Sequence, residues 1–126
     1  DEGSARIMAY PLETVLAEKL ETILVRNVAT TRIRDFYDIY ELWRVKGDTV
    51  DRRIFGKALA ATCEKRNSWK AVERRKEAIN AMRKDDGLER QWEVYVSKHS
   101  YAVGISFQET LNAVWNILES SPLQDD

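Results

Sequence analysis

Charged side chains at helical spacing supply the first candidate chemistry of this sequence. Lys19 and Arg26 are seven residues apart, which is about two turns of an α-helix. On a helical wheel both flank the apolar stripe of their helix, where a charge is partly desolvated and two cations can hold a polyphosphate. The alternative from spacing alone is that Lys19 pairs with Glu18 or Glu21, or extends along the surface into solvent.

Two aspartates follow on the next predicted helix. Asp35 and Asp38 are at positions i and i+3, so their carboxylates lie on the same face of a helix. Paired carboxylates can bind a metal ion or activate a hydroxyl group. The alternative is a structural network, in which Arg34 pairs with Asp38 at i+4 and the helix dipole stabilises Asp35 in the first turn. Spacing does not decide between the two.

Positive charge is concentrated in the middle of the chain. The formal net charge is −1, yet residues 51–84 carry 11 basic and 4 acidic side chains, between flanks of net −2 and −6. Such a segment can attract an anion, and basic residues around a tryptophan suit a nucleic-acid backbone with one stacked base. The alternative is a solvated amphipathic helix. The candidate nucleic-acid contacts are Lys65, Arg66, Trp69, Lys70, Arg74 and Arg75.

Length and composition exclude several classes of protein. The chain has 126 residues, one cysteine and one histidine, which suits one domain or a piece of a larger one. A lone cysteine cannot form an internal disulfide, and with one histidine it cannot make a usual zinc site. No apolar run approaches the roughly 20 residues that span a bilayer. We expect a cytoplasmic protein without membrane contact, with Cys63 buried and His99 at a helix end or on the surface.

The elements that must position these residues are mostly helices. Two prolines and five glycines are few for a β-rich chain, and both prolines lie near the ends. We expect a cap at Thr30 or Thr31, a turn at residues 85–87, and a capping box formed by Ser106 and Glu109. Apolar periodicity predicts a mainly α bundle of about five to six helices, at about 11–26, 31–46, 51–66, 69–84, 88–98 and 106–120.

A short strand is predicted at residues 5–10, immediately before Pro11. A lone strand is not stable in water and needs partners, yet the chain offers no second convincing strand. We therefore expect this strand to belong to a sheet whose other members are missing from the chain.

Several motifs in residues 10–38 occur together in the order of a known family. They are Tyr-Pro-Leu-Glu at residues 10–13, Ala-Glu-Lys at residues 17–19, Arg26, and Arg-Asp-x-x-Asp at residues 34–38. This combination resembles the AbiEii/AbiGii toxin family, whose members are nucleotidyltransferases. A combined match over about 30 residues is more specific than any one motif, and it favours a functional role for Lys19 and Asp35. Residues 88–107 are similar to the family's C-terminal helices more loosely.

The chain also departs from the family pattern. In the family, a catalytic sheet comes first and carries a Gly-Ser turn and an acidic pair such as Asp-x-Asp, which holds the metal ions. Gly3-Ser4 is not that motif, because no strand–turn–helix and no Asp-x-Asp follow it. The chain thus resembles the C-terminal half of such an enzyme. We expect residues 1–46 to end the nucleotidyltransferase core, residues 47–126 to form a C-terminal helical domain, and this piece alone to be inactive.

The resemblance implies transfer of a nucleotide from an NTP to an acceptor, either an RNA such as tRNA or a protein. Mg²⁺ would act in the full-length enzyme, with no metal or cofactor expected in this piece, and the toxin would have a cognate antitoxin. Lys19 would neutralise triphosphate charge, and Asp35 would orient or deprotonate the acceptor, or orient Lys19. The other implied nucleotide contacts are Arg26 and Arg34. The implied supporting residues are Asp38, Glu18 and Arg32. The basic residues between 65 and 75 would contact the acceptor.

Two other functions stay open at this point. One is a helical interaction module without chemistry of its own, which docks a protein partner such as the antitoxin. The other is an RNA-binding module that uses residues 51–84, whose affinity would fall steeply with salt. An in-frame Gly-Ser and Asp-x-Asp coding region upstream of Asp1 would favour the enzyme over the interaction module.

Overall fold

Seven α-helices form the part of the chain that the computed structural model describes, residues 10–120. The mainly α fold predicted from the sequence is therefore confirmed. No strand occurs within these residues. The strand predicted at 5–10 lies outside the described residues except for Tyr10, which is in a bend. The helices are α2 (Leu12–Arg26), α3 (Ile33–Lys46), α4 (Arg52–Arg66), α5 (Trp69–Glu73), α6 (Arg75–Lys84), α7 (Asp86–Lys98) and α8 (Phe107–Ser120).

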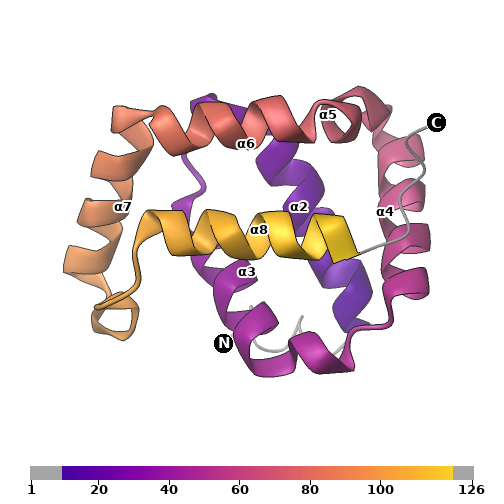
Figure 1. Ribbon diagram of the computed structural model, residues 1–126, viewed down its shortest axis with the longest axis horizontal. Coiled ribbons are helices and arrows are strands. Elements are labelled where there is room, and N and C mark those ends of the chain that lie inside the picture. The colour runs from indigo at the N-terminus through magenta and orange to yellow at the C-terminus, as the bar shows by residue number, and fades with distance from the viewer. Residues whose placement is uncertain (1–9, 121–126) are drawn as a thin grey trace.

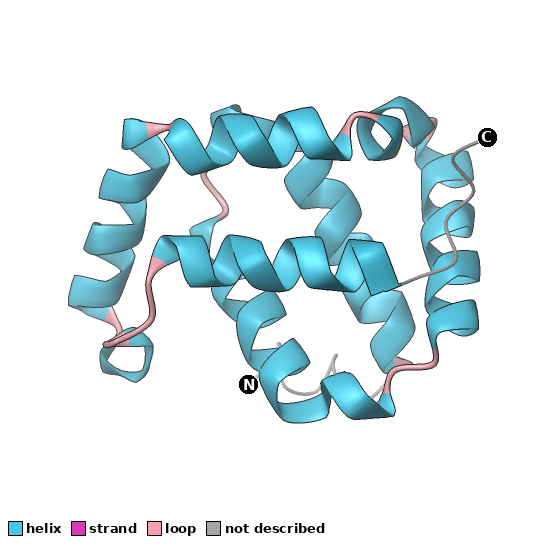
Figure 2. Cartoon of the chain, viewed as in Figure 1, coloured by secondary structure: helices cyan, strands magenta, loops and turns pink. Residues whose placement is uncertain are grey.

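The early helices of the chain pack directly on the later ones. The most extensive contacts join α2 to α4 and α3 to α8, and α2 also packs against α3. In Figure 1, α8 crosses in front of α2 and α3, with α6 above it and with α7 and α4 at opposite ends of the molecule. Figure 2 shows how short the loops between the helices are. The division of the chain into two domains at residue 46 stays a prediction.

One hydrophobic core joins all seven helices. Phe36 of α3 and Phe107 of α8 meet edge to face, with ring centroids 5.0 Å apart, a favoured aromatic geometry. Cys63 is buried, as predicted. Ile54 of α4 is 50% exposed and does not lie on its packing face. The face that packs is instead the one that carries Phe55 and Cys63.

Local side-chain signals set several helix ends. The carboxylate of Asp51 accepts hydrogen bonds from the N–H groups of Arg53 and Ile54, each at 3.0 Å, and so caps α4. The capping box predicted before α8 is confirmed. The Ser106 N–H donates to the Glu109 carboxylate at 3.0 Å, and the Glu109 N–H donates to the Ser106 hydroxyl at 3.0 Å.

Three local predictions are wrong. The helix expected at 69–84 breaks at Arg74, which separates α5 from α6. No turn forms at 85–87, because Asp85 caps α7 by accepting the N–H of Leu88 at 2.9 Å and Gly87 lies inside that helix. Neither threonine is the N-cap of α3, since that position is Arg32, whose side chain makes no capping hydrogen bond; the Thr30 hydroxyl instead accepts the backbone N–H of Arg32 at 3.1 Å.

Candidate active site

Lys19 of α2 joins the two aspartates of α3. Its Nζ lies 3.3 Å from Oδ1 of Asp35 and 3.0 Å from Oδ2 of Asp38. The packing of α2 against α3 brings these carboxylates to the lysine, and the side chains of Lys19, Asp35 and Asp38 are 22%, 6% and 17% exposed. An ammonium group has three N–H donors. Two bonds to carboxylates therefore leave one donor for a further acceptor, such as a phosphate oxygen.

Two arginines complete this group of charges. Nε of Arg32 lies 3.1 Å from Oδ2 of Asp35, and Nε of Arg34 lies 3.7 Å from Oδ1 of Asp38. Each aspartate therefore faces Lys19 with one oxygen and an arginine with the other, and the predicted Arg34–Asp38 pair is confirmed. We call these five residues the Lys19 cluster. Both arginine side chains are exposed, so an anion can approach the cluster from their side.

Aromatic side chains border the Lys19 cluster toward α7. The ring centroid of Tyr37 lies 4.7 Å from that of Tyr101, and the hydroxyls of Tyr95 and Tyr101 are 2.8 Å apart. Burial, together with a hydrogen bond to Glu41, raises the pKa of Tyr37 to about 12. Burial and the hydrogen bond with Tyr101 also raise the pKa of Tyr95. Both hydroxyls are therefore protonated at neutral pH and do not serve as general bases.

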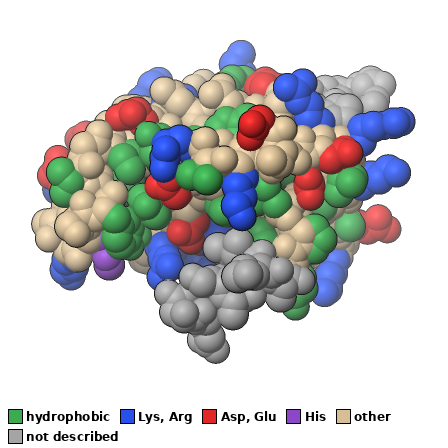
Figure 3. All heavy atoms as spheres, turned by 90° about the horizontal axis from the view of Figure 1, so that it is seen from below, with side chains coloured by type: hydrophobic (Ala, Val, Ile, Leu, Met, Phe, Trp, Pro, Cys, Tyr) green, Lys and Arg blue, Asp and Glu red, His purple; other side chains and the backbone are tan. Residues whose placement is uncertain are grey.

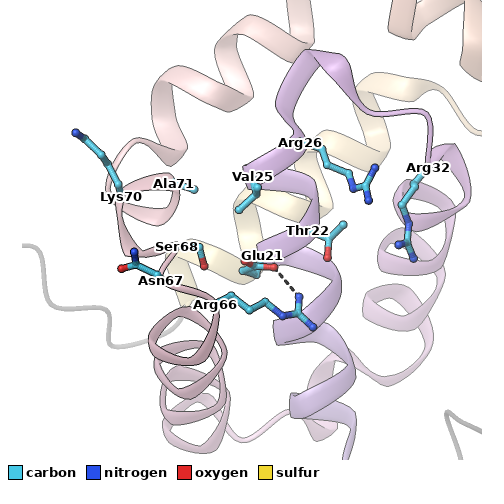
Figure 4. Close-up of a pocket in the computed structure, with 10 residues that line it drawn as sticks. All are labelled: Glu21, Thr22, Val25, Arg26, Arg32, Arg66, Asn67, Ser68, Lys70 and Ala71. Carbon is cyan, nitrogen blue, oxygen red and sulfur yellow. Dashed lines mark hydrogen bonds and ion pairs between the residues drawn. The ribbon is translucent and has the colours of Figure 1, made fainter.

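A second feature, here called the basic pocket, has a volume of about 690 Å³. Figure 4 shows its lining from α2, from the segment before α3, and from the end of α4 through α5. Nη1 of Arg66 donates to Oε1 of Glu21 at 2.7 Å, so Glu21, one of the alternative partners considered for Lys19, bonds to this arginine instead. Nη2 of Arg66 lies 4.0 Å from Oε2 of Glu18. The lining residues are Glu21, Thr22, Val25, Arg26, Arg32, Arg66, Asn67, Ser68, Lys70 and Ala71.

The basic pocket brings together candidates from two separate parts of the sequence. Arg26 and Arg32 come from the motif region, whereas Arg66 and Lys70 come from the basic middle segment. Lys19 does not line the pocket. Arg32 both lines it and pairs with Asp35, so the pocket adjoins the Lys19 cluster.

Only part of the predicted basic surface faces solvent. Arg75, one of the predicted nucleic-acid contacts, is buried and its Nη1 donates to the carbonyl oxygen of Val72 at 2.9 Å, which disfavours a contact with a ligand. Lys65 and Arg74 are exposed but do not line the basic pocket. Trp69 is 38% exposed and adjoins the pocket in sequence.

The remaining reactive side chains lie outside both features. Burial raises the pKa of the Cys63 thiol, which disfavours the thiolate that a nucleophile requires. His99 follows α7 directly, and its ring centroid lies 4.3 Å from that of Tyr95, so its predicted place at a helix end is confirmed.

Across residues 10–120, no three His, Cys, Asp or Glu side chains are grouped so as to hold a metal ion. No helix in that range has the length and apolar character needed to cross a membrane.

Comparison with known families gives the class of the chain, which is that of the nucleotidyl transferase toxins. Residues 1–113 match the family described as nucleotidyl transferase AbiEii toxin, type IV TA system. Because this match covers most of the chain, the protein belongs to the AbiEii family, and the resemblance found in residues 10–38 is confirmed. Membership of a toxin–antitoxin system implies a cognate antitoxin. Comparisons with curated proteins and with solved structures give no match.

Proposed function

We propose that the Lys19 cluster is part of a site that transfers a nucleotide from an NTP to an acceptor, either an RNA such as tRNA or a protein. The observation that carries this proposal is the contact of Lys19 with both aspartates of the Arg-Asp-x-x-Asp motif. In such a transfer, an acceptor oxygen bonds to the α-phosphate while the bond to the departing pyrophosphate oxygen breaks. Positioning and charge stabilisation supply most of the catalysis in this chemistry.

The contacts of the cluster suggest a role for each residue. Lys19 would bind a triphosphate oxygen through its remaining N–H and so offset negative charge on the leaving pyrophosphate. Asp35 is 6% exposed, accepts a hydrogen bond from Lys19 and is ion-paired with Arg32, which favours orienting the lysine over accepting a proton from the acceptor. Asp38 contacts Lys19 directly and would share that task. Arg34 is exposed at the edge of the cluster and would assist in binding phosphate.

The pair formed by Asp35 and Asp38 does not fit a Mg²⁺ ion. Mg²⁺ needs oxygen ligands that converge on it in near-ideal octahedral geometry. Here the ammonium of Lys19 already bridges one oxygen of each aspartate at 3.0 and 3.3 Å, and arginines face the other two oxygens. The requirement for Mg²⁺ in the full-length enzyme stays a prediction that concerns other residues, and loss of activity in EDTA tests it.

The test is incorporation of labelled nucleotide by the complete gene product with each of the four NTPs. We expect Lys19→Ala and Asp35→Ala to lower incorporation by about 100-fold or more. Lys57→Ala, which removes an exposed lysine of α4, is the matched control and should retain full activity. Circular dichroism of each variant confirms folding. Undiminished incorporation by both Lys19→Ala and Asp35→Ala would overturn the assignment.

Two further expectations belong to the same proposal. Residues 1–126 alone are expected to give no turnover, and the incorporation assay on that piece tests this directly. We propose the cytoplasm as the place of the reaction, because it holds both nucleoside triphosphates and RNA. The alternative of an interaction module without chemistry predicts no incorporation by the wild-type protein with any NTP.

A further inference from the structure

We propose that the basic pocket binds successive phosphates of an extended nucleic-acid strand, and that Glu21 is a positioning residue that holds Arg66 in place. The binding of a strand is argued from the pocket alone. The further statement that this strand is the acceptor rests on the proposed function. Four cations and one carboxylate line the pocket, so the lining has a formal charge of +3. Such a concentration of positive charge attracts polyanions.

Glu21 is a nearly buried carboxylate on the wall of a basic pocket. Its side chain is only 5% exposed, whereas that of its partner Arg66 is 43% exposed. A buried charge is costly unless it is paired and hydrogen-bonded, and the 2.7 Å bond from Arg66 meets that need. The bond also fixes the guanidinium at the pocket. Because arginine has five N–H donors, others remain for a phosphate.

Two of the pocket cations keep their charge uncompensated. Among the residues that the structure describes, neither Arg26 nor Lys70 has a carboxylate partner. Both lie on the same pocket as Arg32 and Arg66, so their charges add to the positive potential there. A bound phosphate chain would be attracted by this potential and would release condensed counterions from the nucleic acid.

The spread of the cations favours an extended ligand over a compact one. In Figure 4, Arg26 and Arg32 lie on one side of Glu21, and Lys70 lies on the other side and points away from them. Phosphates spaced along a strand match such a spread better than a single triphosphate. Trp69 precedes Lys70 and is 38% exposed, but it does not line the pocket. On the face seen in Figure 3, by contrast, acidic and basic side chains are interspersed.

The position of the pocket also suits an acceptor strand. Arg32 lines the pocket, and its Nε lies 3.1 Å from Oδ2 of Asp35 in the Lys19 cluster. A strand that lies along the pocket toward Arg32 would bring one end to the cluster. Nucleotidyl transfer requires an acceptor oxygen at that place.

The first test is a fluorescence-anisotropy titration of the complete protein with a labelled single-stranded oligoribonucleotide at several salt concentrations. We expect Arg66→Ala and Lys70→Ala each to weaken binding roughly tenfold. Each should also reduce the slope of log K against log salt by about 0.7. Arg90→Ala, which removes an exposed cation of α7, should change neither quantity. Equal weakening by Arg90→Ala would overturn the pocket as the binding site.

The Glu21→Gln variant distinguishes a positioning role of Glu21 from a purely electrostatic effect of its charge on the ligand. This variant makes the pocket more positive, so the oligoribonucleotide should bind more tightly if Glu21 only repels it. We expect binding to weaken severalfold instead, because Arg66 loses the charge-assisted bond that holds it. The melting temperature of Glu21→Gln shows whether this variant is folded. If it is not folded, Lys70→Ala, at an exposed position, still tests the pocket. Tighter binding by folded Glu21→Gln would overturn the role of Glu21.

Competition with inorganic triphosphate shows whether the pocket binds the phosphates of a nucleic-acid strand or those of an NTP. We expect inorganic triphosphate to displace the oligoribonucleotide only poorly. Efficient displacement would assign the pocket to the NTP and overturn the proposal that it binds a strand.

The binding assay also separates this proposal from the proposed function. Oligoribonucleotide binding without any nucleotide incorporation would defeat the proposed function alone. Incorporation that persists while Arg66→Ala and Lys70→Ala bind the strand normally would defeat this inference alone.

Discussion

The Lys19 cluster and the basic pocket share helix α2 but hold their charges in opposite ways. In the cluster, Asp35 and Asp38 both contact Lys19, and an arginine faces the remaining oxygen of each. In the pocket, Arg26 and Lys70 are exposed and lack a carboxylate partner within residues 10–120. The cluster is thus closely paired around two poorly exposed carboxylates, and the pocket is open with an excess of cations.

Burial accounts for this difference. A carboxylate as little exposed as that of Asp35, at 6%, must be paired if its charge is to be tolerated. An exposed lysine keeps its hydration and needs no partner. A charge in the cluster is therefore expected to contribute to stability and geometry, whereas a charge in the pocket stays hydrated and can attract an anion.

The largest difference in stability is expected when the central cation of each region is removed. Lys19→Met should lower the free energy of unfolding by about 2 kcal/mol, because two poorly exposed carboxylates lose the ammonium between them. Lys70→Met should change it by less than about 0.5 kcal/mol. Urea denaturation of both variants measures the contrast, and equal effects would contradict the distinction between a structural and a binding charge.

A double variant sharpens the same comparison. In Lys19→Met with Asp35→Asn, the less exposed of the two carboxylates in the cluster is removed together with its cation. The double variant should be more stable than the sum of the two single effects predicts, because neither charge is left without the other. Strict additivity in urea denaturation would show that the two groups are not coupled.

A smaller effect is expected within the pocket itself. Arg66→Ala should lower the free energy of unfolding by about 1 kcal/mol, since it leaves Glu21 with its 5% exposed carboxylate unpaired. Solvent reaches Arg66 and moderates this loss. Arg26→Ala removes a cation of the same pocket without breaking a pair and should be nearly neutral. Thermal unfolding of the two variants compares them, and a larger loss for Arg26→Ala would argue against the pairing.

The smallest effect concerns the aromatic border of the cluster and emerges only at high pH. The pKa of Tyr37 is raised from 10.0 to about 12. The contribution of Tyr37 to stability is therefore fully present below about pH 10 and is lost as the pH rises toward 12. Tyr37→Phe should show a shallower decline in unfolding free energy over this interval. Identical pH profiles for Tyr37→Phe and the wild type would exclude the raised pKa.

Local patterns in the sequence predicted much of the Lys19 cluster. The i, i+3 spacing of Asp35 and Asp38 placed both carboxylates on one face, and the i+4 rule identified the Arg34–Asp38 pair. The motif combination then singled out Lys19. These features depend on one helix at a time, or on a motif, so helical periodicity is enough to find them.

The basic pocket could not be found in the same way. Glu21 and Arg66 are 45 residues apart, and their contact depends on how α2 packs against α4. The sequence predicted that one helix ends at residue 66 and the next begins at 69, but not that Arg66 and Lys70 line one pocket with Arg26 and Arg32. The burial of Arg75 likewise follows from tertiary packing after the break at Arg74. Sequence periodicity describes the faces of helices but not which faces meet.

Arg32 belongs to both regions, since it lines the basic pocket and pairs with Asp35. A ligand that draws this guanidinium toward the pocket must weaken its pair with Asp35, and Asp35 in turn holds Lys19. If both regions bind the ligands proposed for them, the two binding equilibria would be linked through this one side chain. If a strand in the pocket alters the affinity of the cluster for a nucleotide, the nucleotide must alter the affinity for the strand by the same factor.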